Sequence, residues 1–327
     1  MPRPAQGSCR VTVIVRPATT ADEDLGTIAA IANATSPEDS TSVEDMRWSD
    51  ATYSGSKRWI AELDGRPIGA ATVGRIHVYP PDYGALWATI GILPEARRLG
   101  AGQALLHRIG ATAERAGKAH LEIPVAADRQ DAVRFLEHRG FVEHDRARAV
   151  RLDLAGRAVP ALNVPRGIEL TDLAARPDLV DGIHALAIEA FVDIPGGNQP
   201  MAPGDLAEFR ARDVDRPGIP AAGFAIAVER ATGRVVGYAS LLHKPDSPGV
   251  AYHDMTAVRR AWRGHGLATA LKLRTIAYAI DQGLAALETG NDEGNLAMQA
   301  VNRRLGYRPL PDLLTMRGQV DRVMMTA

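Results

Sequence analysis

A short glycine turn occurs twice in this chain, and the second copy follows the first by 166 positions. The copies are Arg97-Arg98-Leu99-Gly100-Ala101-Gly102 and Arg263-Gly264-His265-Gly266-Leu267-Ala268. The match continues at the same spacing, with Glu122 aligned to Glu288 and Gly140-Phe141 aligned to Gly306-Tyr307. A strand, turn, helix, strand and helix kept in register over about fifty residues indicate an internal repeat.

The repeat predicts two domains of one fold, and 327 residues are enough for two separate cores. Hairpin turn signals and a strand-helix-strand unit occur in each half, which predicts an α/β fold. We expect each half to hold a mixed sheet with helices on both faces. The predicted boundaries are a flexible N-terminus at 1–10, a first domain at 11–154, a linker at 155–167 and a second domain at 168–327.

The apolar periodicity and the turn residues predict the individual elements. Strands are expected at 11–15, 58–63, 67–73, 86–92, 120–125, 148–154, 168–171, 224–229, 234–242, 250–258, 284–289 and 313–318. Helices are expected at 21–34, 102–116, 130–138, 178–191, 266–282 and 295–305. The segment 193–222 is polar and proline-rich and is left without predicted elements.

The composition narrows the function classes. The formal net charge is −1 and no charge block occurs, which argues against a nucleic-acid partner. No apolar run reaches the roughly 18 residues that span a bilayer, so no membrane partner is expected. Cys9 is the only cysteine, and the N-terminus has no apolar signal region, which predicts a cytoplasmic, reducing location. The histidines show no metal-ligand spacing, so no metal is expected.

The glycine turns predict anion sites. Backbone N–H groups at the start of a helix point outward without partners, and the helix dipole favours negative charge there. Arg97 and Arg263 could add charge-assisted bonds. A turn that only satisfies loop geometry is the alternative, but two copies in register favour anion binding. Neither copy has the spacing of an ATP-binding P-loop or of a nicotinamide-binding turn.

The strand, the R-x-x-G-x-(G/A) turn and the helix resemble the coenzyme A pyrophosphate site of the GNAT N-acyltransferase superfamily, once in each half. Asn295, Gly306 and Tyr307 also fit the later helix of that family, while the first half has Arg129 where Asn295 stands. The architecture is similar to that of mycothiol synthases, which have two copies. The resemblance implies acetyl-CoA as the cofactor and partly splayed sheets.

The resemblance also implies which residues hold the cofactor. In the second half these are Thr256, Ala257, Val258, Arg263, Gly264, His265, Gly266, Leu267, Ala268, Asn291, Asn295 and Asn302. The first half offers a second candidate set, which is Ile92, Arg97, Arg98, Gly100, Ala101 and Gly102.

Acetyl transfer to an amine requires a proton acceptor, because an alkylammonium has a pKa of about 10.4. In the resembled family such bases often stand on the strand before the turn, which here carries Tyr252, His253 and Asp254, with Asp254 favoured. At the same spacing the first half has Leu86 and Ala88, which predicts a catalytic second half and a degenerate first half. Solvated polar residues at a strand start are the alternative interpretation.

The family's usual general acid is a tyrosine on the late helix, and Asn302 stands at that position. The acid is then another residue, a water molecule or unnecessary. We expect an N-acetyltransferase that moves an acetyl group to a primary amine of a small molecule by direct attack. The alternatives are a coenzyme A sensor or scaffold without chemistry, an enzyme active in both halves, and a mycothiol synthase-like or antibiotic-modifying enzyme. We expect a monomer, with a dimer as the alternative.

Overall fold

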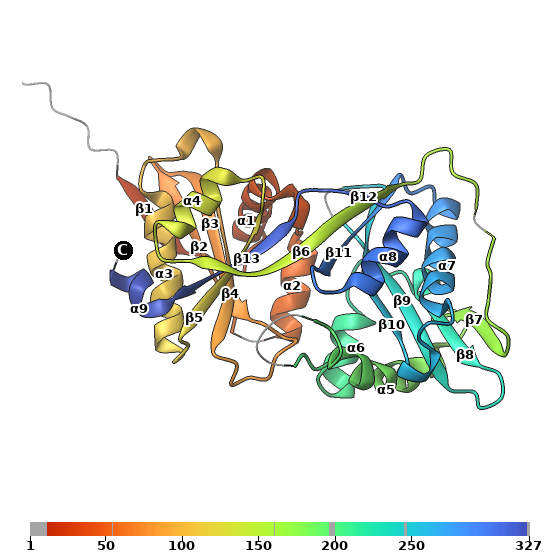
Figure 1. The fold of residues 1–327 in the computed structure, drawn as a ribbon. Helices are drawn as coiled ribbons and strands as arrows, with labels where there is room; N and C mark the ends of the chain where they lie inside the picture. Colours follow the sequence, from red (N-terminus) through yellow and green to blue (C-terminus); the bar gives the residue numbers. More distant parts are fainter. Residues whose placement is uncertain (1–11, 54, 160, 196–199, 245–246, 326–327) are drawn as a thin grey trace, which may run out of the picture.

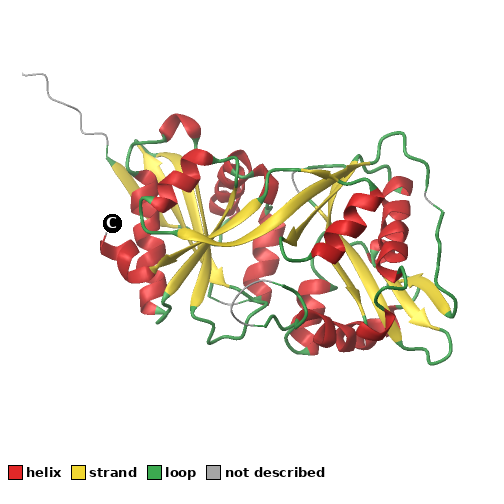
Figure 2. Ribbon diagram, in the orientation of Figure 1, coloured by secondary structure: helices red, strands yellow, loops and turns green. Residues whose placement is uncertain are grey.

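The structure is a computed structural model and describes residues 12–53, 55–159, 161–195, 200–244 and 247–325. The predicted flexible N-terminus at 1–10, with Cys9, lies outside the described residues. The molecule is elongated, and each half has a sheet with helices on both faces (Figures 1 and 2). This arrangement confirms the predicted α/β class with a mixed sheet.

The main strands and α-helices follow one order in both halves, and the second half adds β12 and α9. In the first half they are β1 (Val13–Pro17), α1 (Asp22–Thr35), η1 (Pro37–Asp39), α2 (Val43–Thr52), β2 (Lys57–Leu63), β3 (Arg66–Arg75), β4 (Ala85–Ile92), η2 (Pro94–Ala96), α3 (Ala101–Arg115), β5 (His120–Ala126), α4 (Gln130–Glu137) and β6 (Val142–Asp153). In the second half they are β7 (Ile168–Asp172), η3 (Pro177–Leu179), α5 (Val180–Phe191), α6 (Leu206–Asp213), η4 (Ala221–Gly223), β8 (Ala225–Glu229), β9 (Val235–His243), β10 (Val250–Val258), η5 (Arg260–Trp262), α7 (Leu267–Asp281), β11 (Ala286–Asp292), α8 (Leu296–Leu305), β12 (Arg308–Pro309), β13 (Leu313–Gln319) and α9 (Val320–Met325).

The halves exchange their last strands. Strand β13, from the end of the chain, pairs antiparallel with β5 and places Met316 opposite Ile123. Strand β6, from the first half, pairs antiparallel with β11 and places Leu152 opposite Leu287. The main strand order is therefore continuous, β1-β2-β3-β4-β5-β13-β6-β11-β10-β9-β8-β7, with β12 beside β6. Figure 1 shows β6 running from one half into the other, so the two halves share one sheet.

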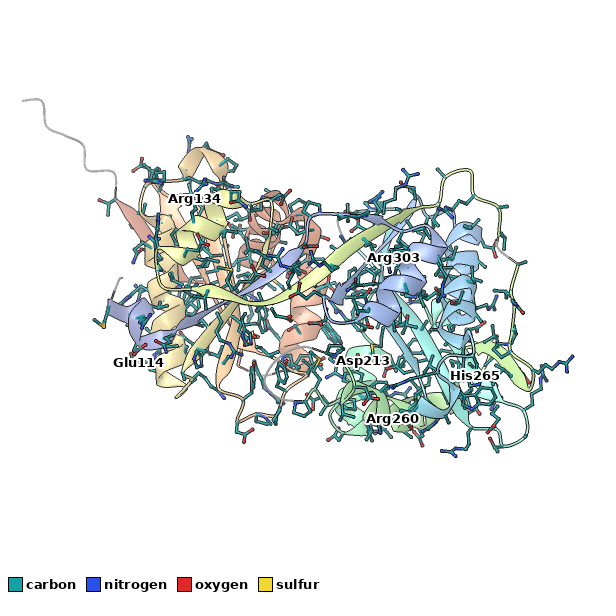
Figure 3. All side chains as sticks on the ribbon, in the orientation of Figure 1. Glu114, Arg134, Asp213, Arg260, His265 and Arg303 are labelled. Atoms are coloured by element: carbon teal, nitrogen blue, oxygen red, sulfur yellow. The ribbon has the colours of Figure 1, made fainter. Side chains whose placement is uncertain are left out.

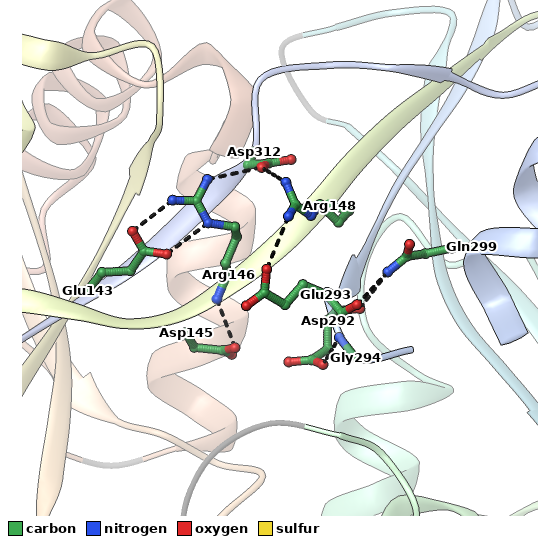
Figure 4. A network of polar contacts seen from close by, with 9 residues as sticks. All are labelled: Glu143, Asp145, Arg146, Arg148, Asp292, Glu293, Gly294, Gln299 and Asp312. Atoms are coloured by element: carbon green, nitrogen blue, oxygen red, sulfur yellow. Dashed lines mark hydrogen bonds and ion pairs between the residues drawn. The ribbon is translucent and has the colours of Figure 1, made fainter. Parts of the chain in front are cut away.

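Charged side chains brace the exchanged strands where β6 crosses between the halves (Figure 4). Arg146 and Arg148 on β6 both bind the Asp312 carboxylate just before β13, with N–O distances of 3.1 and 2.6 Å. Arg148 also reaches Glu293, which follows β11, at 3.1 Å. One strand of the first half is thus tied to two segments of the second.

Each half has apolar layers on both faces of its sheet. In the first half α3 packs on one face through Leu105 and Ile109, while α1 packs on the other through Leu25 and Ile28. The corresponding layers of the second half are formed by α7 and α5. Helix α6 falls in the segment for which no element was predicted; Asp205 caps it by accepting a bond from the Glu208 N–H at 2.9 Å.

The strand before each glycine turn diverges from its parallel neighbour. Strands β4 and β5 pair only through Ala85–His120, Leu86–Leu121 and Trp87–Glu122. Strands β10 and β11 likewise pair only through three positions, ending at Tyr252 opposite Glu288. The predicted partial splay is present in both halves, and one edge of each strand is left without a strand partner beyond that point.

Candidate active site

The two glycine turns have the same backbone conformation. Gly100 and Gly266 precede α3 and α7 with φ angles of +92° and +81°. Two residues earlier, Arg98 and Gly264 have φ angles of 68° and 79°, so a non-glycine residue takes a left-handed conformation in the first copy. Among the described residues, no hydrogen bond uses the backbone N–H groups of 98–102 or 264–268. Both turns can therefore receive an anion.

The motif arginines brace their turns. The Arg97 Nε donates to the Ile92 carbonyl at 3.4 Å, and the Arg263 Nε donates to the Val258 carbonyl at 3.0 Å. Each also forms an ion pair, Arg97 with Asp131 at 2.6 Å and Arg263 with Asp193 at 2.8 Å. An anion at either turn would share its arginine with that carboxylate.

A cavity of about 580 Å³ opens beside the first turn. Ile90 and Ile92 of β4 and Ile123 and Val125 of β5 line it, so it occupies the gap between the diverging strands. Five arginines and two carboxylates stand on its wall: Arg97, Arg98, Arg129, Arg134, Arg139, Glu38 and Asp131. Figure 3 labels Arg134 in this half. A cavity lined by apolar strand residues and by arginines fits a polyanionic ligand with an apolar arm, as coenzyme A has.

A β-bulge distinguishes β10 from β4. The pairing of β10 with β9 shifts register between His253 and Thr256, whereas β4 pairs with β3 without interruption. Strand β10 therefore contains one residue more than β4, within its bulge at Asp254 and Met255. The alignment of Asp254 with Ala88 assumed the same spacing to the motif arginine in both halves. It was wrong, because the bulge shifts β10 by one residue relative to β4. Parallel pairing aligns Tyr252 with Trp87 and His253 with Ala88, so Asp254 lies in a bulge that the first half lacks.

Asp254 lies where the two halves meet. The name "junction" is used here for the charged residues Asp39, Asp213, Arg216, Lys244 and Asp254. Lys244 ties the halves together, because its Nζ donates to the Glu38 carbonyl at 3.1 Å and to Glu288 at 2.5 Å. Figure 3 shows Asp213 near the middle of the molecule and His265, in the second turn, farther from the first half.

Asp254 is exposed to solvent on β10. Desolvation by the protein around it raises the pKa of its carboxyl above the ordinary value, while Arg216, Arg212 and the Ser240 hydroxyl oppose the rise. Burial also raises the pKa of the neighbouring Asp213 to about 6, although Arg212 donates to it at 2.6 Å. The junction therefore holds a carboxylate suited to accept a proton near neutral pH.

The other two predicted proton carriers face different surroundings. The Tyr252 hydroxyl accepts a hydrogen bond from the Gly290 N–H at 2.8 Å, and burial raises its pKa to about 12. His253 is 1% exposed and faces α7, where its ring nitrogens lie 3.3 Å from the Tyr307 and Thr275 hydroxyls. The structure thus separates His253 from Asp254 and brings only Tyr252 near it.

His253 belongs to a buried polar cluster that also contains Lys272, Thr275 and Tyr307. Lys272 is 1% exposed, and its Nζ lies 5.2 Å from the Tyr307 ring centre. The cluster has no carboxylate, and burial lowers the pKa of Lys272 to about 7. The corresponding residues of the first half are all apolar and buried: Ala88, Leu106, Ile109 and Phe141. The second half thus has buried polar side chains at positions where the first half has an apolar core.

The predicted asparagines have identified partners. Asn295 caps α8 by accepting a bond from the Met298 N–H at 3.2 Å. Asn302 is 2% exposed and donates to Asn291 Oδ1 at 2.6 Å, while its own Oδ1 is buried without a hydrogen-bond partner. Within β10, Ala257 and Val258 are buried and Thr256 is half-buried. Glu288, the repeat partner of Glu122, is paired with Lys244 and Arg151.

Both halves of the chain match one known protein family. The family model described as the acetyltransferase (GNAT) family matches residues 27–141 and 189–307, once in each half. The chain belongs to the GNAT family. It is an acetyltransferase of tandem architecture, and GNAT enzymes use acyl-CoA cosubstrates.

Individual GNAT relatives cover most of the chain. Mycothiol acetyltransferase of Thermobifida fusca (strain YX) is 24% identical over an alignment of 260 residues, which covers 74% of this chain and 76% of the relative. A tandem GNAT protein from the clavulanic acid biosynthesis pathway has a TM-score of 0.75 at 23% identity and covers 94% of this chain and 99% of its own. A GCN5-related N-acetyltransferase from Sphaerobacter thermophilus has a TM-score of 0.73 at 19% identity, with 95% and 96% covered. The two structures share the fold.

No described helix is long and apolar enough to cross a membrane. Within the same residues, no group of three or more His, Cys, Asp or Glu side chains could hold a metal ion.

Some residues of this GNAT site were not among the predicted ones. Asp39 and Lys244 meet only through tertiary packing, and nothing in their sequence surroundings marks them. Asp213 and Arg216 stand in the polar segment 193–222, and that charge pattern was the one available signal.

Proposed function

We propose that this GNAT enzyme transfers an acetyl group from acetyl-CoA to a primary amine of a small molecule, and that its second half, residues 168–327, is catalytic. The first half, residues 11–154, would hold coenzyme A without turnover and would supply part of the acceptor site. The single observation that carries the proposal is the bulge in β10. It adds a carboxylate at the junction, and β4 has neither the bulge nor the carboxylate.

The cofactor would lie along β10 and over the second turn. Acetyl-CoA supplies the acetyl group as a thioester, which is open to nucleophiles. Beyond Tyr252, β10 no longer pairs with β11, so its free edge suits main-chain recognition of an extended arm. The N–H groups of 264–268 suit the pyrophosphate, and an N–H near Val258 could stabilise negative charge that develops on the carbonyl oxygen.

Asp254 would take the proton of the acceptor amine. An alkylammonium has a pKa of about 10.4 and does not attack until it loses that proton. The raised pKa of Asp254 makes it a stronger base than a carboxylate with the ordinary pKa. Tyr252, one residue before it on β10, would help to orient the amine or a bridging water. His253 takes no part, because it is buried on the α7 side of the sheet.

The Asp254→Asn variant tests this assignment. We expect kcat to fall by about 10²–10⁴-fold, the range that general-base catalysis supplies. We also expect the acidic limb of the pH–rate profile to disappear, since wild-type activity rises as Asp254 loses its proton. The KM for acetyl-CoA should change little. Steady-state kinetics between pH 5.5 and 9 measure all three.

The matched control is Asp215→Asn, which removes an exposed carboxylate paired with Arg210 near the end of α6. It should leave the profile unchanged. Equal activity of Asp254→Asn and wild type at every pH would remove Asp254 from the mechanism. Acetyl-CoA binding without acetylation of any amine would instead favour the alternative function, a coenzyme A sensor or scaffold.

A further inference from the structure

Arg216 differs from the other cations near the junction, because none of its N–H groups donates a hydrogen bond to a described residue. Arg212 donates two bonds to Asp213, at 2.9 and 2.6 Å, and others to backbone carbonyls. Lys244 is bound to Glu288 and to the Glu38 carbonyl. Arg216 donates no hydrogen bond to any described residue, and its one ion pair, with Asp45, is 4.0 Å long. A guanidinium has five N–H donors, so this side chain has unused binding capacity.

The position of Arg216 is nevertheless held. Its guanidinium carbon lies 5.2 Å from the ring centre of Trp48 on α2, in a cation–π contact. Its Nε is buried without a partner, while 34% of the side chain remains exposed. The hydroxyl of Tyr53, whose ring meets Trp48 edge-on at 5.8 Å, is also buried without a partner. Unsatisfied polar groups of this kind need an acceptor from outside the chain.

Arg216 lies within electrostatic reach of two unpaired carboxylates. Its charge is the strongest one opposing the raised pKa of both Asp254 and Asp39. Neither carboxylate forms an ion pair with Arg216 within 4.0 Å, so neither neutralises its charge by direct contact. Asp254 belongs to the second half and Asp39 to η1 of the first.

We propose that the acceptor is an amino acid with a single carboxylate, whose carboxylate binds Arg216 while its amine lies at Asp254. This inference rests on the proposed function and names the substrate class of the same site. Arginine suits a carboxylate because its planar fork matches the two oxygens. Asp39 would repel a second carboxylate, which sets monocarboxylic amino acids apart from aspartate and glutamate. A polyamine has no carboxylate that could pair with Arg216, so the charge of the guanidinium would stay without a partner.

Matched acceptor trios test the proposal. Each trio contains an amino acid, its primary amide and the amine without the carboxyl group. Examples are leucine, leucinamide and 3-methylbutylamine; lysine, lysinamide and cadaverine; and phenylalanine, phenylalaninamide and phenethylamine, with glutamate as the dicarboxylate. We expect kcat/KM to favour at least one amino acid over its amide and its amine. In Arg216→Gln this preference should fall about 10- to 100-fold, mainly through KM, as expected for a lost charge-assisted bond.

Arg210→Gln is the matched control, because Arg210 lies on α6, is exposed and is already paired with Asp215. It should keep the wild-type preference. Direct binding of the same amino acids by titration provides a second readout in wild type and Arg216→Gln.

The inference is overturned if amides or amines are acetylated as well as the acids, or if Arg216→Gln keeps the preference. It is also overturned if no amino acid binds or reacts. The first of these results leaves the proposed function intact, because amines would still be acetylated. Failure of acetyl-CoA itself to bind would instead overturn the proposed function.

Discussion

At the scale of single residues, the two halves act as internal controls for each other. Lys272, Thr275 and Tyr307 have the apolar partners Leu106, Ile109 and Phe141 in the first half. Burying a charged lysine without a carboxylate partner is energetically unfavourable, and this lowers the pKa of Lys272 to about 7. The polar cluster therefore reduces the stability of the second half below what an apolar copy would give.

The Lys272→Met variant should be more stable than wild type, and the gain should shrink as pH rises. Between pH 7 and about 10, the folded wild type has lost the Lys272 proton while the unfolded chain keeps it, so wild-type stability increases with pH. The slope is at most about 1.4 kcal/mol per pH unit. Urea unfolding at pH 7, 8 and 9 measures it. Lys57→Met, at an exposed lysine, is the control, and parallel pH curves for Lys272→Met and wild type would contradict this account.

Several site residues followed from the sequence, and others did not. The turn glycines and Asp254 could be selected because they belong to one local strand-turn-helix pattern. Local patterns do not reveal a bulge, however, since the register of a strand depends on its partner. Asp39 and Arg216 stand 177 positions apart in the chain, and only the packing of the two halves, with α2 against α6, brings them into one site.

At the scale of elements, the repeat predicted most strands and helices to within two or three residues. Helices α2, α6 and α9 were missed, because these short sequences show too little apolar periodicity to predict a helix. Strand β6 begins at Val142, six residues before the predicted start, because β13 pairs with the polar segment from Val142 to Ala147, which has no apolar strand pattern of its own.

The two turns provide a matched pair of variants, Gly266→Glu and Gly100→Glu. Both positions have similar positive φ angles, and a Cβ at either meets open space, so both variants carry the same backbone strain. Each places a carboxylate at an N–H cradle and should weaken coenzyme A binding there by at least about tenfold.

Calorimetric titration with acetyl-CoA separates the two sites. We expect two binding events in wild type and one in each variant, with activity lost only in Gly266→Glu. Loss of activity in Gly100→Glu alone would move the working cofactor site to the first half. Unchanged binding in both variants would mean that neither turn receives the pyrophosphate.

At the scale of the whole molecule, the strand exchange makes the halves interdependent. A cut within 155–159 would leave the first fragment without β13 and the second without β6. Each fragment would then expose an unpaired strand edge, β5 or β11, which favours aggregation. The sequence repeat suggested two separate cores, and this interdependence could not be read from it because exchanged and unexchanged strands have the same local pattern.

Coexpressed fragments 1–157 and 158–327 should therefore copurify with the activity of the intact chain, whereas each fragment alone should be insoluble or poorly folded. Affinity purification through a tag on one fragment, followed by circular dichroism, measures this. A control cut in the exposed hairpin at Asp64-Gly65, between β2 and β3, keeps β5, β6, β11 and β13 together in one fragment. Two well-folded, separable fragments from the first cut would contradict the paired strands.

Because β13 lies near the end of the chain, it is synthesised long after β5, the strand with which it pairs. Strand β5 leaves the ribosome about 190 residues before the strand that pairs with it. At roughly 5 to 20 residues per second, the first half waits on the order of 10 to 40 seconds for its missing neighbour. During that interval its sheet has an open edge, a natural contact for a chaperone, so a stop codon shortly before Leu313 would harm the half that was made first.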